Sequence, residues 1–230
     1  MATRPIFVPC FDTVGVIEDM LEFKWHPGMA LVQKKKSIYE LHQVANNKGY
    51  KKILEISSKS EDKAGIELSA FNLTITTKKK GNKFSVESAF QGSKVFEEGG
   101  PYLDLLNMES LKAKKDIRLR ESGNLIGFRF FGKDFPIIPR TFFYDWIYIN
   151  ALVSHHNLSA KARSYDAYSD IEFNPKKSIN CQAHSVALYV SLYVNKVLEK
   201  ALQSPESFLE VTRPYYKRQN RNTAIQNTFI

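Results

Sequence analysis

A carboxylate and an amine stand at helical spacing near the middle of the chain. Glu87, Phe90, Gln91 and Lys94 occupy positions i, i+3, i+4 and i+7, so a helix over residues 86–96 would carry them on one face. A carboxylate and a lysine that line a partly buried cleft shift each other's pKa, which is how general bases and nucleophilic amines are tuned. We therefore take Glu87 and Lys94 as candidate catalytic residues. The alternative is an exposed helix on which both charges are solvated.

The histidines and cysteines offer no comparable pattern. His155 and His156 are adjacent and face apart on most backbones, while the other three histidines lack a carboxylate or cysteine at metal-ligand spacing. Cys10 and Cys181 are far apart in the sequence and fit neither a disulfide framework nor a zinc site. We expect no metal, no cofactor and a reducing, cytoplasmic location. No apolar stretch approaches the roughly 20 residues of a bilayer span, so we expect no membrane partner.

Short elements on both sides must hold the central segment. Residues 73–77 and 84–86 are typical of a hairpin whose Gly81-Asn82 turn favours positive φ. The helix over 86–96 follows, and Gly99-Gly100-Pro101 cannot prolong it. Other strands are expected over 5–9, 21–25, 52–57 and 124–131, and other helices over 37–46, 108–115, 141–153, 157–165 and 180–202. This mixture predicts an α+β fold in which helices predominate.

Positive charge is clustered along the chain. The formal net charge is +9, and lysine clusters are what a nucleic-acid backbone selects because each phosphate contact releases counterions. The candidate nucleic-acid contacts are Lys78, Lys79, Lys80, Lys83, Lys114 and Lys115. The alternative is that these lysines lie on solvated turns and helix faces.

Three weaker signals suggest contacts with a phosphorylated ligand. Ser57, Ser58 and Lys59 offer hydroxyls and an amine where a pyrophosphate could bind, although a solvated turn has the same composition. Asn180 stands where it could cap the long helix that follows, and a helix N-terminus favours phosphate. Trp146 belongs to an aromatic run that could stack a purine or pack in the core.

The segments around the Glu87 helix carry a family resemblance. Leu68-Ser69-Ala70-Phe71, a hairpin, and then the pattern VExxFQxxK from Val86 to Lys94 resemble the NADAR (YbiA-like) family, whose LSNF element precedes a VEHxFQAxK helix. Residues 111–115, 157–158 and 170–175 are similar to further family elements in the same order. The similarity spans residues 54–182, and VExxFQxxK is its most specific part.

The longer segments GGPYLDLL, GFRFFGKDFP, FYDWIYINAL and DIEFNPKKSINCQA resemble the NADAR antitoxins that accompany DarT-type toxins. The resemblance implies an enzyme that hydrolyses the N-glycosidic link between ADP-ribose and the guanine amino group. Its partners would be ADP-ribosylated single-stranded DNA, ADP-ribose as product and a DarT-type toxin. Two alternatives stay open: a YbiA-like N-glycosidase of a phosphorylated small-molecule N-glycoside, and a non-catalytic protein that binds the toxin or nucleic acid.

The resemblance also implies roles for single residues. Glu87 and Lys94 match the catalytic helix of the family, and Glu172 matches the acidic residue of its LVE element, so these three are the expected catalytic residues. Lys94 could protonate the leaving base or attack the sugar carbon as an amine. The expected ligand contacts are Ser57, Ser58, Lys59, Asn72, Phe90, Gln91, Trp146, Asp170 and Asn180.

The chain departs from the family pattern after Glu172. The family's aspartate and WG pair are replaced by Lys176-Lys177 and Asn180-Cys181, and Ala70 stands where LSNF has asparagine. A hydrophobic content of 43% excludes a disordered chain. We expect a YbiA-like single α+β domain with a small hairpin or sheet. An N-terminal α+β extension would cover residues 1–50, the catalytic domain 51–212 and a basic polar tail 213–230.

Overall fold

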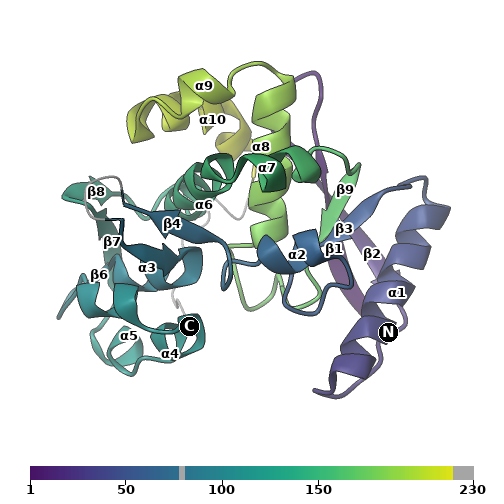
Figure 1. Cartoon of the computed structure of the whole chain (residues 1–230), viewed down its shortest axis with the longest axis horizontal. Helices are drawn as coiled ribbons and strands as arrows, with labels where there is room; N and C mark the ends of the chain where they lie inside the picture. The colour runs from purple at the N-terminus through teal and green to yellow at the C-terminus, as the bar shows by residue number, and fades with distance from the viewer. Residues whose placement is uncertain (78–80, 220–230) are drawn as a thin grey trace.

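The structure is a computed structural model that describes residues 1–77 and 81–219 (Figure 1). Helices and small sheets alternate along the chain, so the predicted α+β class is confirmed. The strands are β1 (Ala2–Pro9), β2 (Val16–Phe23), β3 (Ile53–Glu55), β4 (Thr74–Thr76), β5 (Lys83–Ser85), β6 (Lys94–Phe96), β7 (Leu125–Phe130), β8 (Lys133–Phe135) and β9 (Ala167–Ser169). The helices are α1 (Leu31–Asn47), α2 (Lys63–Glu67), α3 (Val86–Gly92), the 3₁₀ helix η1 (Leu103–Asn107), α4 (Ser110–Lys114), α5 (Arg118–Glu121), α6 (Phe142–Ser154), α7 (His156–Ala162), α8 (Gln182–Val194), α9 (Leu198–Ala201) and α10 (Pro205–Arg218).

The largest sheet has the strand order β2-β1-β9-β3. Strand β1 is antiparallel to both neighbours and pairs Phe7 with Tyr168, while β3 runs parallel to β9. Successive side chains of a strand point to opposite faces. Accordingly Ile6 joins a small apolar cluster that includes Leu41 of α1, whereas Phe7 joins the main core. The sheet is therefore covered by α1 on one face and by the main core, which includes α8, on the other.

The two smaller sheets lie on the opposite side of the molecule in Figure 1. The hairpin predicted around Gly81 is present as β4 and β5, which pair Ile75 with Phe84. Strands β6, β7 and β8 form an antiparallel sheet in sequence order. Helices α6 and α8, buried along most of their length, lie between this group and the β2-β1-β9-β3 sheet.

The helix predicted over residues 86–96 ends earlier. Helix α3 stops at Gly92, and Lys94 begins β6, which pairs with β7. The backbone at Gly100 explains part of this change, because a Cβ there would lie 2.2 Å from the carbonyl oxygen of Lys94 and φ is +84°. Only glycine accepts that approach and that φ without strain. The prediction that one helix carries both Glu87 and Lys94 is therefore wrong.

The C-terminal region also differs from expectation. The helix predicted over 180–202 is interrupted after Val194, where Lys196 adopts a φ of 59° before α9 begins. Helix α10 continues to Arg218, so the first residues of the predicted polar tail are helical. The remaining tail from residue 220 lies outside the described residues. Across residues 1–77 and 81–219, no helix combines the length and apolar character that a bilayer crossing needs.

A buried polar network ties α6, α8 and α10 together. The carboxylate of Asp145 accepts hydrogen bonds from Ser185 Oγ at 2.6 Å and from Tyr216 OH at 2.9 Å, and it lies 3.2 Å from His184 Nδ1. His184 Nε2 lies 2.8 Å from Tyr215 OH. Burial acts to raise the pKa of Asp145, but His184 and the hydrogen bonds hold it below its ordinary value. The network anchors α10 to the core through polar contacts.

Candidate active site

Glu87 lies in the first turn of α3 and is only 6% exposed. Ser85 caps the helix by accepting a hydrogen bond from the Ser88 amide at 3.0 Å. The amide of Glu87 donates to the carbonyl of Ala70 at 2.9 Å, which joins α3 to the Leu68–Phe71 segment. The two sequence motifs that resemble one family are thus in direct contact.

Two groups hold one oxygen of the Glu87 carboxylate. Gln91 Nε2 donates to Oε1 at 2.9 Å, and Lys114 Nζ lies 3.6 Å from the same atom. Among the described residues, none donates a hydrogen bond to Oε2. The carboxylate is therefore positioned through one oxygen while the other is available to a ligand or a water.

Lys94 is on β6, and its side chain extends to Phe90 of α3. Its Nζ lies 5.0 Å from the centroid of the Phe90 ring, a cation-π distance. Burial lowers the pKa of Lys94 to about 8, with Glu87 acting to raise it and Lys114 acting to lower it further. The structure therefore brings Glu87, Phe90, Gln91 and Lys94 together, although a strand and not the helix delivers the lysine.

Gln91 has an unsatisfied side-chain oxygen. The residue is 6% exposed, and its Oε1 is buried and has no hydrogen-bond partner in the described part of the chain. A carboxylate can only accept, so the amide nitrogen must face Glu87 and the oxygen must face elsewhere. A buried polar atom left without a partner costs about 1–3 kcal/mol. The geometry leaves an acceptor ready for an N–H or O–H of a ligand.

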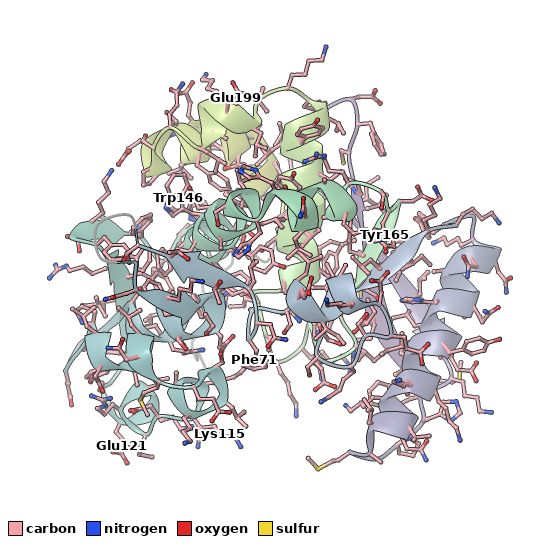
Figure 2. The ribbon with its side chains drawn as sticks, in the orientation of Figure 1. Phe71, Lys115, Glu121, Trp146, Tyr165 and Glu199 are labelled. Atoms are coloured by element: carbon pink, nitrogen blue, oxygen red, sulfur yellow. The ribbon has the colours of Figure 1, made fainter. Side chains whose placement is uncertain are left out.

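Aromatic side chains surround these groups. Tyr144 of α6 meets the Phe90 ring edge-on at 5.1 Å, and burial together with the charge of Glu87 raises its pKa well above the ordinary value. Phe71, labelled in Figure 2, has Lys114 Nζ 5.3 Å from its ring centroid. Sequence reasoning included Tyr144 in the aromatic run that could stack a purine, but it did not select Phe71. The signal for Phe71 was present, because it ends the Leu68–Phe71 motif.

Tyr144 also interacts electrostatically with a second group of carboxylates, formed by Glu55 and Asp170. Glu55 is 3% exposed and accepts hydrogen bonds from Ser57 Oγ at 2.7 Å, Ser169 Oγ at 2.5 Å and the Ile171 amide at 2.9 Å. Burial raises the pKa of Glu55 and also that of Asp170, which reaches about 8 because Glu55 adds its charge. Asp170 also interacts electrostatically with Tyr144. Sequence reasoning missed Glu55, which no motif marked.

Glu172 lies at the outer side of this cluster. Its side chain is 46% exposed and lies 3.1 Å from Lys34 Nζ, so it faces α1 and solvent. Asp170, two residues earlier, is 7% exposed and accepts hydrogen bonds from the amides of Glu172 and Phe173. Of the two predicted acidic residues, Asp170 is therefore the one enclosed beside Tyr144.

Several predicted ligand contacts lie elsewhere or serve local structure. Trp146 packs against Phe208 of α10, and Figure 2 shows it near that helix and away from Phe71. Asn72 donates to the carbonyl of Ile66 at 2.8 Å and lines a separate hollow of about 570 Å³ beside α7. Trp146 therefore does not lie with Glu87. Asn72 lines a surface other than the one near Glu87.

The Ser57 turn is partly occupied by its own hydrogen bonds. Ser57 is buried, donates to Glu55 and accepts from the Lys59 amide at 3.1 Å, whereas Ser58 is exposed. Asn180 was expected to cap the long helix, but the residue at the cap position of α8 is Cys181. The Oδ1 atom of Asn180 is buried and has no hydrogen-bond partner among the described residues.

The predicted nucleic-acid contacts divide into three groups. Lys78, Lys79 and Lys80 lie outside the described residues. Lys83 and Lys115 are exposed, on β5 and just after α4. Lys114 is the exception because it pairs with Glu87. Within residues 1–77 and 81–219, no group of three or more histidine, cysteine or acidic side chains is arranged to hold a metal ion.

Comparison with family models gives a match that covers most of the chain. A family model described as the DarT1-associated NADAR antitoxin matches residues 2–222. The match includes β1, β2 and α1 at one end and α10 at the other, so it takes in the α3 segment together with the sheet that carries Asp170. No curated protein matches the chain.

Proposed function

The chain belongs to the family of DarT1-associated NADAR antitoxins, and we propose that it removes ADP-ribose from the guanine amino group of single-stranded DNA. The family supports the antitoxin role and its association with a DarT1 toxin. The resemblance of the VExxFQxxK segment supports an N-glycosidic hydrolase. The proposed products are unmodified guanine and free ADP-ribose, formed without a cofactor.

The observation that carries the proposal is the electrostatic interaction of Glu87 with Lys94, whose Nζ lies over the ring of Phe90. A buried carboxylate, one oxygen of which accepts no hydrogen bond from the described residues, interacts electrostatically with a lysine whose pKa is lowered to about 8. Groups with such perturbed surroundings concentrate at catalytic sites. Gln91 adds a buried acceptor with no partner among the described residues, and such an acceptor gains from binding a ligand donor.

Glu87 is proposed to act on the sugar. Breaking the bond between the anomeric carbon and the guanine nitrogen builds positive charge on the ribose, which a nearby carboxylate stabilises. Water adds its oxygen to the anomeric carbon and gives a proton to Glu87. The electron pair of the broken C–N bond goes to the base nitrogen, which takes up a proton. Gln91 and Lys114 hold Glu87 Oε1, so Oε2 is the reacting oxygen in this scheme.

Lys94 is proposed to act at the same bond, in one of two ways that experiment separates. As an ammonium group it donates the proton that the leaving base needs. As a neutral amine it attacks the anomeric carbon, expels the base and is later released from the sugar by water. With a pKa of about 8, the ammonium form predominates at neutral pH and the amine form above pH 8.

The remaining site residues are proposed to bind the substrate. Gln91 Oε1 would accept a hydrogen bond from the base or a ribose hydroxyl, and Phe71 with Tyr144 would border the reacting sugar or base. Asp170 stays a proposed ligand contact beside Tyr144. Glu172 stays a proposed catalytic residue, although its ion pair with Lys34 gives it a second role.

The test is hydrolysis of an oligonucleotide that carries ADP-ribose on guanine. The expected result is loss of the adduct with equal release of ADP-ribose and of unmodified strand, measured by chromatography and mass spectrometry. An unchanged adduct after prolonged incubation with folded protein would overturn the proposal.

Two matched arms separate the alternative functions. A mononucleotide-like N-glycoside processed faster than the oligonucleotide, with little salt dependence, would indicate a small-molecule N-glycosidase. Rescue of toxin-treated cells by the Glu87→Gln variant would indicate protection by binding, because binding survives the loss of a carboxylate and hydrolysis does not.

A further inference from the structure

Two cations of the N-terminal region converge on one indole ring. The guanidinium carbon of Arg4, on β1, lies 5.4 Å from the centroid of Trp25, and Lys34 Nζ, on α1, lies 5.1 Å from it. Both are cation-π distances. Trp25 follows β2 and packs edge-on against Phe23. The indole thus fixes two long basic side chains at the same place.

This basic pair meets the turn that follows β9. Strand β1 is antiparallel to β9 with Phe7 opposite Tyr168, so the register carries Arg4 toward Ile171. The charge of Arg4 interacts with Asp170 and Glu172, and Lys34 Nζ lies 3.1 Å from Glu172 Oε1. Asp170 in turn interacts with Tyr144, as does Glu87. Asp170 therefore interacts electrostatically with both Arg4 and Tyr144, and Tyr144 interacts with Glu87.

Arg4 carries an unused hydrogen-bond donor. Its Nε atom is buried and has no partner in the described part of the chain, while Nη1 donates to the carbonyl of Thr3 at 2.9 Å. Burial lowers the pKa of Arg4 against the opposing charges of Asp170 and Glu172. A buried charged donor without an acceptor is costly. Guanidinium N–H groups match phosphate oxygens in both geometry and charge.

The nearest acidic groups do not prevent an anion from binding. Burial and the charge of Glu55 raise the pKa of Asp170, which favours the neutral form of this carboxyl group and weakens its opposition to an anion. Glu172 is matched by Lys34. Arg4, Lys34 and Glu172 together then carry one net positive charge, because Lys34 and Glu172 balance each other.

We propose that Arg4 and Lys34 form a phosphate subsite at the Asp170–Glu172 turn and bind the phosphate groups of the substrate. The inference rests on the proposed function, because a phosphorylated ribose whose anomeric carbon is at Glu87 extends its phosphates away from the reacting bond. The phosphate oxygens accept from the guanidinium group of the partly exposed Arg4, and Lys34 lies between the phosphate and Glu172. The segment before residue 50 thereby becomes part of the substrate site.

Calorimetric titration with ADP-ribose tests the subsite without any catalytic step. Arg4→Met and Lys34→Met should raise the Kd for ADP-ribose, by roughly 10- to 100-fold for Arg4, the range expected for a hydrogen bond to a charged group. Arg4→Lys should fall between the wild type and Arg4→Met, because it keeps the charge and loses Nε–H. Lys35→Met is the matched control, since Lys35 is also on α1 but pairs with Glu61 at 3.4 Å.

Two further arms identify the source of the phosphate. Weaker ADP-ribose binding by the Arg4 variants assigns the subsite to the pyrophosphate. An unchanged ADP-ribose Kd with weaker binding of an unmodified oligonucleotide assigns it to a DNA phosphate. Unchanged binding of both ligands, or failure of the wild type to bind either, overturns the subsite.

The outcomes also separate this subsite from the proposed reaction. Wild-type protein that binds ADP-ribose through Arg4 but leaves the DNA adduct intact would keep the subsite and remove the hydrolase. Thermal unfolding of each variant checks that it is folded, and Arg4→Lys, which keeps the charge above Trp25, serves where Arg4→Met does not fold.

Discussion

Lys114 Nζ lies 3.6 Å from Glu87 Oε1, and the two residues come from neighbouring helices, α4 and α3. The carboxylate is buried, whereas the lysine is 53% exposed. Lys114 also lies over Phe71 and lowers the pKa of Lys94. One surface lysine, predicted from sequence as a nucleic-acid contact, therefore touches or influences three groups of the candidate active site.

Replacing Lys114 by methionine is expected to change the pH dependence of the reaction. Removing a like charge raises the pKa of Lys94, so the inflection assigned to Lys94 should move to higher pH, and kcat should fall because Glu87 loses a positioning partner. The measurement is kcat against pH with the modified oligonucleotide. Lys112→Met is the control. Lys112 is also on α4, but within the described residues it forms an ion pair with Glu109 and not with Glu87. The same inflection in both variants would exclude this role.

Glu87→Gln should abolish most of the activity without unfolding the protein. Loss of a general base or charge-stabilising carboxylate lowers kcat by roughly 10²- to 10⁴-fold. Single-turnover hydrolysis and thermal unfolding, measured on the same preparations, check the two halves of the prediction. Glu109→Gln is the matched control, since that carboxylate is 65% exposed and belongs to the N-cap residue of α4. Full activity in Glu87→Gln would remove Glu87 from the mechanism.

The pH profile of the wild type should distinguish the two roles of Lys94. The pKa of Lys94 is lowered to about 8, mainly by burial. If the ammonium donates a proton, kcat falls as the pH rises through about 8; if the amine attacks the sugar, kcat rises over the same interval. Trapping with cyanoborohydride should link sugar to protein only in the second case. A profile without an inflection near pH 8, together with full activity in Lys94→Ala, would exclude both roles.

Gln91→Met should weaken catalysis and have two opposing effects on stability. The variant removes an acceptor that a substrate donor would satisfy, so kcat/KM should drop roughly 10- to 100-fold. It also removes a buried oxygen with no partner among the described residues, which favours the variant, and the hydrogen bond from Nε2 to Glu87, which favours the wild type, so the net change in the free energy of unfolding should be small. Urea unfolding and steady-state kinetics measure both effects, with exposed Gln203→Met as the control. A loss of stability with unchanged kcat/KM would show that Gln91 is structural.

The Asp145 network should make stability depend on acid pH. The pKa of Asp145 in the folded protein is below its ordinary value of about 4, so its contribution is complete above about pH 4 and is lost as the pH falls through the folded-state pKa. Tyr216→Phe removes one hydrogen bond to this carboxylate and should lower the free energy of unfolding by about 1.5–3 kcal/mol.

Urea unfolding between pH 3 and pH 7 measures the network. Asp145→Asn should show a flatter pH dependence, and Tyr39→Phe, at a position 63% exposed, should match the wild type. An acid transition of equal size in Asp145→Asn would assign the effect to other carboxyl groups.

Local patterns sufficed for the hairpin, the start of α3 at Val86 and the helices with strong apolar spacing. They failed at Lys94 because its conformation depends on residues 125–128, which pair with β6 only in the folded chain. The same limit explains Glu55. Its partners are Ser57, two residues away, and Ser169 and Ile171, which come from the far end of the sequence. No spacing rule connects positions so distant.

The aromatic residues show a different limit. Tyr144 and Trp146 are two positions apart on α6, and a helix turns such neighbours toward different sides. The sequence supplied both as candidates for stacking, yet Tyr144 meets Phe90 while Trp146 meets Phe208. Which side of a largely buried helix faces the site depends on tertiary packing, and α6 is apolar around most of its circumference.

The position of β1 inside its sheet has a consequence for synthesis of the protein. Strand β1 lies between β2 and β9, and its partner residue Tyr168 is translated long after Phe7. Contacts so distant along the chain form only after the intervening segment has been made. A truncated chain that stops before β9 therefore lacks the Asp170 turn and also lacks β9, the strand that pairs with β1. Synthesis that stops before residue 167 therefore yields a chain in which β1 has only β2 as a neighbour and this sheet stays incomplete.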